Sequence, residues 1–151
     1  MTKAKGVTYR PDGTVLKCLF CDIMDKVEPG SIVRENELFV AFKTIAPASS
    51  NHLLICPRMH IQNVNTLTGS SDVQMLNKMK EFGRLALGDD SADAQYSFHI
   101  PPWNSIDHLH MHAIGNRPSM GWKGALKYWQ GTFYCWSVEE AIRVIEKASQ
   151  G

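Results

Sequence analysis

The chain has 151 residues, of which 44% are hydrophobic, and this fits one domain with its own core. Its 16 basic and 15 acidic side chains give a formal net charge of +1, which argues against a protein that binds nucleic acid by charge. No apolar run reaches about 20 residues and Met1–Gly13 is polar, so we expect neither a membrane span nor a secretory signal.

Four cysteines are present, two of them in the pair Cys18-x-x-Cys21. This usage indicates a reducing compartment, with metal or redox chemistry rather than a disulfide framework. We therefore expect a soluble intracellular protein of the cytoplasm, with the nucleus as an alternative.

The first half of the chain predicts a polar arm followed by short strands. Met1–Lys17 is polar and interrupted by a turn at Pro11-Asp12-Gly13, so we expect a flexible arm before a single domain of residues 18–151. Asp22–Val27 predicts a short helix that Pro29-Gly30 ends. Strands are predicted at Ile32–Arg34 and Leu38–Lys43, joined as a hairpin by Glu35-Asn36-Glu37, and at His52–Cys56, which Pro57 ends.

The second half contains the clearest helical pattern. Apolar residues recur at helical spacing from Val73 to Ala86, after the potential N-cap oxygens of Ser70, Ser71 and Asp72. Further elements are predicted as strands at Gln95–Ile100 and Ile106–Ile114, and as a helix at Val138–Ala148 that Ser137 caps. Short strands around one long helix favour an antiparallel α+β domain.

The stretch Ile106–Ile114 reads Ile-Asp-His-Leu-His-Met-His-Ala-Ile. Successive side chains of a strand point to opposite faces, so His108, His110 and His112 are expected on one face and an apolar set on the other. Imidazole can act as a base, a nucleophile or a metal ligand near neutral pH. This stretch is therefore the first candidate for a functional site.

The residues alone leave several interpretations open. Cys18-x-x-Cys21 is a zinc pair, a redox pair or neither, although the absence of a βαβ pattern argues against a thioredoxin-like role. Ser105 either donates to a ligand or is an ordinary loop serine, and Arg117 either meets a phosphate or caps a strand. Three functions fit: a histidine nucleophile acting on phosphorus, a catalytic zinc hydrolase with three histidine ligands, and a zinc-stabilised binding module.

The motif His108-Leu-His110-Met-His112-Ala-Ile resembles that of the histidine triad family. The segments around it are similar as well: His52-Leu-Leu-Ile-Cys-Pro-Arg-Met-His60, Phe42-Lys-Thr-Ile-Ala-Pro47 and Cys18-Leu-Phe-Cys21-Asp-Ile. Phe98-His-Ile-Pro-Pro-Trp103 and the aromatic tail resemble most the third histidine-triad nucleotide-binding subgroup of the Hint branch. The resemblance implies a five-stranded antiparallel sheet with one long and one C-terminal helix, in a homodimer.

The resemblance also implies an activity, which is the cleavage of adenosine phosphoramidates or acyl-adenylates to AMP through a covalent nucleotidyl-histidine. It assigns the nucleophile to His110, phosphate or leaving-group contacts to His112, His52 and Ser105, and the purine nucleotide to Phe42, Thr44, His99 and Asn104. Thr44 stands where the family usually has an acidic residue, and His99 where many relatives have Asn. A nucleotide-binding or adaptor protein with weak or lost activity is the alternative.

A structural zinc ion is the cofactor that the resemblance implies. Its ligands would be Cys18, Cys21, His60 and His108, which fill all four positions of a tetrahedral site. His108 would then hold the motif in place, and His110 would remain free to react.

Overall fold

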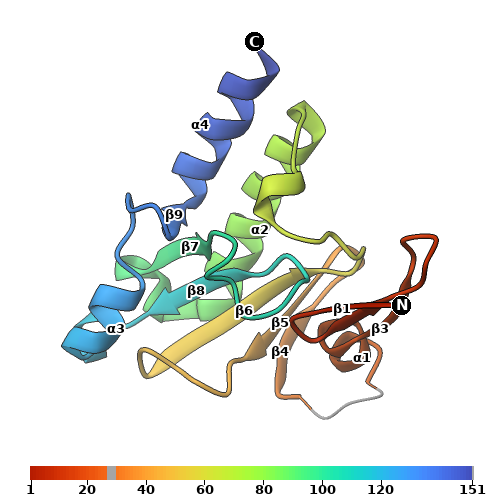
Figure 1. Ribbon diagram of the computed structural model, residues 1–151. Helices are drawn as coiled ribbons and strands as arrows, with labels where there is room; N and C mark the ends of the chain where they lie inside the picture. The colour runs from red at the N-terminus through yellow and green to blue at the C-terminus, as the bar shows by residue number, and fades with distance from the viewer. Residues whose placement is uncertain (27–29, 151) are drawn as a thin grey trace.

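A six-stranded antiparallel sheet forms the centre of the computed structural model, which describes residues 1–26 and 30–150 (Figure 1). In spatial order its strands are β4 (Ile32–Glu35), β5 (Phe39–Lys43), β6 (Asn51–Pro57), β8 (Met111–Gly115), β7 (Gln95–His99) and β9 (Cys135–Ser137). The α+β class and the antiparallel pairing are as predicted. The predicted number of five strands is wrong, because β9 adds a sixth strand at the edge beside β7. At three residues, β9 is too short for its alternation to be recognised within the aromatic tail.

The predicted histidine strand is shorter than its sequence pattern. Only Met111–Gly115 forms the ladder, so the prediction of a strand is wrong for residues 106–110. The last pair between β6 and β8 joins Ile55 to Met111, and β6 ends at Pro57. Upstream, the N–H of Leu109 donates instead to the carbonyl oxygen of Ile61 at 2.6 Å. The alternation of His108 and His110 therefore belongs to a buried, extended segment that leads into the strand.

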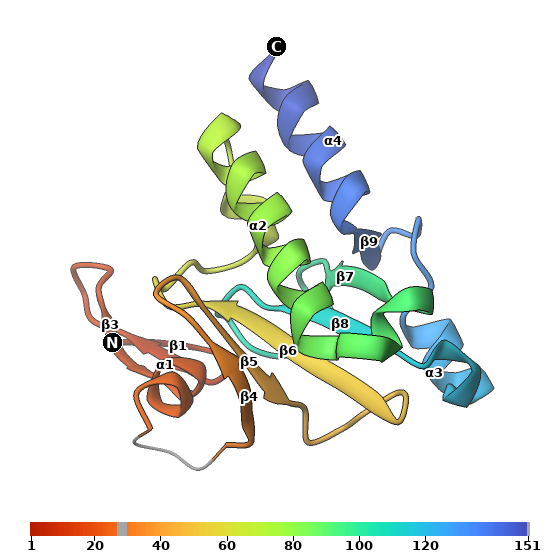
Figure 2. The same ribbon diagram turned by 180° about the vertical axis from the view of Figure 1, so that it is seen from behind.

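Helix α2 (Ser70–Leu87) packs across one face of the sheet, as Figure 2 shows from behind. The helix comes close to the sheet at Gly83, where a Cβ atom would lie 2.9 Å from the side chain of Met111. Its N-cap is Gly69, which corrects the predicted cap at Ser70, Ser71 or Asp72. The carboxylate of Asp72 instead accepts the N–H groups of Thr68 and Gly69 from within the first turn.

The C-terminal helix α4 (Val138–Ser149) confirms the predicted position and cap. The Ser137 hydroxyl accepts the N–H of Glu140, and the Glu140 carboxylate accepts the N–H of Ser137, both at 3.1 Å. This reciprocal pair satisfies two donors that the helix itself cannot pair. Helices α2 and α4 pack against each other, and their far ends extend beyond the sheet (Figures 1 and 2).

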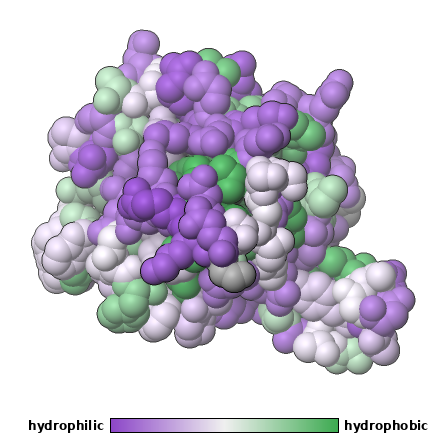
Figure 3. Space-filling view, turned by 90° about the horizontal axis from the view of Figure 1, so that it is seen from above, coloured by the Kyte–Doolittle hydropathy of each residue, from purple (hydrophilic) through white to green (hydrophobic). Residues whose placement is uncertain are grey.

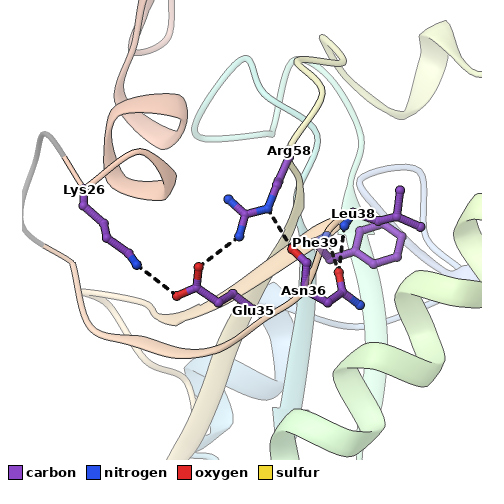
Figure 4. A network of polar contacts seen from close by, with 6 residues as sticks. All are labelled: Lys26, Glu35, Asn36, Leu38, Phe39 and Arg58. Atoms are coloured by element: carbon purple, nitrogen blue, oxygen red, sulfur yellow. Dashed lines mark hydrogen bonds and ion pairs between the residues drawn. The ribbon is translucent and has the colours of Figure 1, made fainter.

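The predicted hairpin of β4 and β5 is confirmed, and polar contacts hold its turn (Figure 4). The side-chain oxygen of Asn36 accepts the N–H groups of Leu38 and Phe39 at 2.8 and 2.7 Å. Arg58 donates to the carbonyl of Asn36, and Glu35 pairs with both Arg58 and Lys26. The two ion pairs are exposed and contribute little stability, so the Asn36 amide is the main determinant of this turn.

Residues 1–17 are not the flexible arm that their polarity predicts. They fold, with Cys18, into a three-stranded antiparallel meander of β1 (Thr2–Ala4), β2 (Val7–Tyr9) and β3 (Val15–Cys18). Val7 is buried in a second apolar cluster together with Phe20 and Phe42. This burial explains why the meander is held against the domain. The few apolar residues of this polar segment did not indicate it, because they form no regular pattern.

The remaining elements are short. Helix α1 (Leu19–Met24) begins before the predicted Asp22, while the predicted end at Val27 and the stop at Pro29 lie outside the described residues. Helix α3 (Trp122–Lys127) lies in the aromatic tail, at the end of the sheet away from the meander (Figure 1). The 3-10 turns are Val64–Thr66, Gly88–Asp93 and Arg117–Ser119.

Seen from above, the molecule presents a mainly hydrophilic surface with hydrophobic residues between the polar ones (Figure 3). Within the described residues, none of the helices has both the length and the apolar character needed to span a bilayer.

Candidate active site and metal centre

Four ligand atoms converge where the histidine motif meets α1. Cys18, Cys21, His60 and His108 each offer one sulfur or nitrogen atom, and these four atoms lie within 4.8 Å of one another. Nδ1 of His108 lies 3.5 Å from each sulfur and 3.1 Å from Nδ1 of His60, and the Cys21 sulfur lies 3.7 Å from Nδ1 of His60. A tetrahedral zinc ion with bonds of about 2.3 Å to sulfur and about 2.05 Å to nitrogen has ligand separations of roughly 3.3–3.8 Å. The four predicted ligands are therefore brought together with spacings that fit zinc.

The partners of the two imidazoles leave lone pairs facing the centre. Nε2 of His108 donates to the carbonyl oxygen of Pro57 at 2.9 Å. Nε2 of His60 donates at 3.0 Å to the hydroxyl of Tyr9, which in turn donates to the Asp107 carboxylate at 2.7 Å. Both Nδ1 atoms are then unprotonated, and they stand only 3.1 Å apart. Two lone pairs at this distance repel unless a cation lies between them, so the donor set itself calls for a metal.

The two thiols of the cysteine pair differ in acidity. The hydrogen bond that the Cys21 thiol donates to the Cys18 sulfur is the main reason why the pKa of Cys18 lies well below its usual value, and the same contact, together with burial, raises the pKa of Cys21. Thiolate is the form that binds zinc. Among the described residues, the Cys/His/Asp/Glu group that meets the spacing of a metal site is this one, so His108, His110 and His112 do not meet as three ligands of one ion.

His110 points into a different environment. Its Nδ1 lies 2.7 Å from the carbonyl oxygen of His108, which can only accept, so Nδ1 carries the proton. Nε2 therefore keeps its lone pair. The ring is buried, with the edge-to-face ring of Phe20 on one side at 5.1 Å and His112 on the other at 5.2 Å between centroids. The backbone thus fixes His110 in the tautomer of a nucleophile.

His112 is in the opposite tautomer, with its proton on Nε2, and a chain of hydrogen bonds fixes it. The N–H of Ala48 donates to Nδ1 of His52 at 2.9 Å, so the proton of His52 is on Nε2. Nε2 of His52 donates at 2.9 Å to Nδ1 of His112, which places the proton of His112 on its own Nε2. That N–H is buried and has no partner in the described part of the chain. It is a buried donor on the ring next to that of His110.

Tyr128 packs against three histidines of the site, although no pattern in the sequence marks it as a site residue. Its ring stacks on His99 at 4.7 Å and meets His112 and His52 edge-on at 4.9 and 5.2 Å. Nε2 of His99 donates to the carbonyl oxygen of Lys127 at 2.9 Å. The end of α3 thereby holds both His99 and Tyr128 against His110 and His112, which we call the reactive pair. Tyr128 is one of many aromatic residues in the tail, and only the fold distinguishes it.

The site is neutral near pH 7. Burial lowers the pKa of His110 and of His52 to about 4, with a smaller contribution from the neighbouring histidines. Burial also lowers the pKa of His112 well below its usual value, as it lowers that of His99. Because all four rings are in the neutral form at neutral pH, with one proton each, the lone pair on Nε2 of His110 is available.

The other predicted residues differ in burial and in their hydrogen-bond partners. Phe42 is buried against Phe20, and the Thr44 hydroxyl accepts the N–H of Ala46 in the following turn. Asn104 is buried and shares a small cavity with His99 and His110, while its amide is bonded to Lys5 and Ile106. Ser105 and Arg117 are both exposed.

Comparisons with known proteins agree with the geometry. Residues 17–128 match the family model described as scavenger mRNA decapping enzyme C-term binding. The chain is 32% identical to the adenosine 5′-monophosphoramidase HINT3 of Xenopus tropicalis, over 94% of this chain and 96% of that protein. It is 34% identical to the bifunctional adenosine 5′-phosphosulfate phosphorylase/adenylylsulfatase HINT4 of Arabidopsis thaliana, over 74% and 77%.

A solved structure also matches the fold. The HIT family hydrolase from Clostridium thermocellum superposes with a TM-score of 0.61 at 30% identity, covering 68% of this chain and 93% of that one.

Proposed function

Because this chain belongs to the histidine triad family, we propose that it hydrolyses adenosine 5′-phosphoramidates and acyl-adenylates to AMP. The names of its relatives support this activity, since one is an adenosine 5′-monophosphoramidase and another an adenylylsulfatase. In each case a group bonded to the phosphorus of an adenosine 5′-phosphate is displaced. The reaction class is therefore nucleotidyl transfer, with water as the final acceptor.

The observation that carries the proposal is the pair of opposite tautomers at His110 and His112. Nε2 of His110 presents a lone pair, and Nε2 of His112 presents an unpaired N–H. An in-line displacement at phosphorus needs a nucleophile on one side and donors for the non-bridging oxygens. The two rings supply one of each from a buried position, where water does not weaken the interaction.

In the first step, Nε2 of His110 forms a bond to phosphorus and the phosphorus–nitrogen bond to the amine breaks. The amine keeps the electron pair and takes a proton from water. The histidine ring becomes cationic, and its charge is stabilised by the carbonyl oxygen of His108 at 2.7 Å from Nδ1. In the second step, water attacks phosphorus and the bond to Nε2 breaks, which releases AMP. The attacking water loses one proton, and this replaces the proton that the amine took from water in the first step.

His112 and His52 act as a fixed donor to the phosphate. Neither ring has to ionise, since the N–H of Ala48 sets the proton of His52 and His52 sets that of His112. The donor is therefore oriented before substrate arrives, which is the condition for strong stabilisation of developing charge.

We assign the two ends of the substrate to the two sides of this pair. The nucleoside lies toward Phe42 and Thr44, and Thr44 offers the ribose a single hydroxyl in place of a carboxylate. His99 and Asn104, which the resemblance also assigns to the nucleotide, line a small cavity together with His110. Ser105, exposed on the loop before the motif, is proposed to contact the leaving group.

The metal centre is proposed to be structural zinc. When bound, zinc would link α1 to the segment that carries His108 and would take no part in the displacement, because its four protein ligands leave no open position. His108 then contributes to catalysis through its backbone carbonyl, which fixes His110.

We also propose a homodimer, as is usual for the family. Exposed aromatic residues of the tail, among them Trp122 at 73% and Trp129 at 61% exposure, support a contact surface. Sedimentation equilibrium measures the mass directly, and a monomer at micromolar concentration would contradict the proposal.

The test of the function is turnover of an adenosine 5′-phosphoramidate. The wild-type chain should release AMP, and a reaction quenched in base should yield the chain with one AMP added at His110, located by mass spectrometry. His110→Ala should abolish the adduct and reduce kcat by about 10³-fold or more. An adduct that persists in His110→Ala, or tight binding of AMP by the wild type without any turnover, would contradict the proposal.

A further inference from the structure

The N-terminal meander of residues 2–18 contacts the metal centre and residues 102–107, the loop that precedes the histidine motif, although nothing in the proposed reaction uses it. It lies beside α1, at the end of the sheet away from α3 (Figure 1). The contacts are made by three of its residues, Lys5, Gly6 and Tyr9.

Tyr9, at the end of β2, makes the most specific of these contacts. Its hydroxyl accepts from Nε2 of His60 at 3.0 Å and donates to the Asp107 carboxylate at 2.7 Å. Its ring meets the His60 ring edge-on at 5.8 Å. Asp107 is adjacent in sequence to His108, so one hydroxyl joins the surroundings of two metal ligands.

Lys5 fixes the loop itself. Its Nζ donates to the backbone carbonyl oxygens of Pro102 and Asn104 and to the side-chain oxygen of Asn104. Its own carbonyl oxygen accepts the N–H of Asp107 at 2.9 Å. The loop is therefore held by the meander near both of its ends.

The backbone around Gly6 brings these contacts together. The carbonyl oxygen of Gly6 accepts the N–H of Leu19, the residue after Cys18, at 3.1 Å. Gly6 has φ +78°, and a Cβ atom there would lie 2.9 Å from the side chain of Ile106. A larger residue would be strained in conformation and would crowd the loop, so glycine permits the close approach.

We infer that Tyr9 is a positioning residue of the metal centre, and that the meander holds it in place. The inference rests on the metal centre of the proposed function but not on the phosphoramidase chemistry. A ligating histidine binds metal with the correct nitrogen when an outer partner holds the proton on the other nitrogen. Tyr9 does this for His60, and Asp107 fixes the direction of the Tyr9 hydroxyl. His108 has the carbonyl oxygen of Pro57 in the same role.

The test is Tyr9→Phe, which removes this hydroxyl and keeps the ring. Zinc affinity is measured by competition with a chromophoric chelator, and the absorption spectrum of the cobalt(II)-loaded chain reports the ligand geometry. We expect Tyr9→Phe to bind zinc about 10-fold more weakly, and up to roughly 100-fold, which is the usual range for loss of an outer partner. We also expect a changed cobalt(II) spectrum.

Tyr96→Phe is the matched control. It removes a buried hydroxyl that has no hydrogen-bond partner in the described ranges and lies in the core of the sheet. Its zinc affinity and cobalt(II) spectrum should equal those of the wild type, and both variants should unfold near the wild-type temperature when metal-free.

The outcomes separate the inference from its premise. Equal zinc affinity and an equal cobalt(II) spectrum in Tyr9→Phe and wild type would overturn the role of Tyr9 and leave the metal centre standing. A wild-type chain that binds no zinc would overturn the metal centre and the role of Tyr9 together. Neither result depends on turnover of a nucleotide.

Discussion

Two histidine clusters each include residues of the segment 108–112, and they differ in where their protons are. At the metal centre, Nδ1 of His60 and Nδ1 of His108 face each other with lone pairs 3.1 Å apart. At the reactive pair, His110 presents a lone pair and His112 an N–H. The first arrangement offers two lone pairs to a cation, and the second offers a lone pair to an electrophilic centre and an N–H to an anionic oxygen. Identical side chains thus acquire different chemistry from their hydrogen-bond partners.

The partners that make this difference are mostly backbone groups. The carbonyl oxygen of Pro57 fixes His108, that of His108 fixes His110, and the N–H of Ala48 fixes the chain through His52 to His112. A backbone carbonyl or N–H is present whichever side chain the residue carries, so the fold positions these partners. Both clusters are therefore oriented before any ligand binds, which is how enzymes avoid reorganisation during the reaction.

Cys21→Ser should weaken metal binding and leave the chemistry of the reactive pair unchanged. A serine hydroxyl is a poor zinc ligand at neutral pH, so we expect zinc affinity to fall by about 10³-fold, with a lower melting temperature in the presence of zinc. Metal analysis and thermal unfolding measure the two effects. The AMP adduct on His110 should still form at low temperature.

Cys135→Ser is the control for that change, because Cys135 is a free cysteine on β9 that does not belong to the four-ligand group. It should retain one equivalent of zinc. Full zinc binding by Cys21→Ser would contradict the role of Cys21 as a ligand, and loss of the AMP adduct would show that the two clusters are not independent.

His52→Ala should affect the reactive pair alone. Without the donor at Nδ1, His112 can move its proton and lose the N–H that faces the substrate, so kcat should fall by about 100-fold. Zinc affinity should not change. His52→Gln retains an N–H donor toward His112 and should recover about tenfold of the lost rate, and equal rates in the two variants would contradict the donor chain.

The pH dependence gives the smallest effect and tests the neutral state of the reactive pair. Burial lowers the pKa of His110 from 6.5 to about 4, so the nucleophile is unprotonated above that pH and becomes protonated below it. The value of kcat/KM should stay level from about pH 8 to 6 and fall only as the pH approaches about 4. Since His52 also has a pKa of about 4, the acid limb belongs to the coupled cluster. Circular dichroism checks that the chain stays folded, and a limb near pH 6.5 would contradict the burial argument.

Much of the fold follows from local pattern. The spacing from Val73 to Ala86 specifies α2, Ser137 with Glu140 specifies the start of α4, and Asn36 specifies the hairpin of β4 and β5. Each of these depends on residues close in sequence, so the sequence determines it. The cysteine pair and the three alternating histidines are likewise recognisable as sites from residue type and spacing.

Other features depended on contacts between residues far apart in the sequence. The meander exists because Val7 is buried and Tyr9 and Lys5 bond to residues about 50 to 100 positions away, so its polarity was misleading. The strand of the histidine motif starts only at Met111, because the N–H of Leu109 donates to the carbonyl oxygen of Ile61 and not to β6. Tyr128 joins the site because α3 returns to His99.

The residue types available for chemistry can be recognised without the structure: two cysteines at zinc-pair spacing and histidines at strand ends. Folding sets which nitrogen of each histidine carries the proton. That choice depends on a carbonyl or N–H brought within about 3 Å by folding, and neighbouring residues in the sequence do not encode it. The resemblance to the histidine triad family implies the proposed division of the motif between a metal ligand, a nucleophile and a donor, and these contacts are what would enforce it.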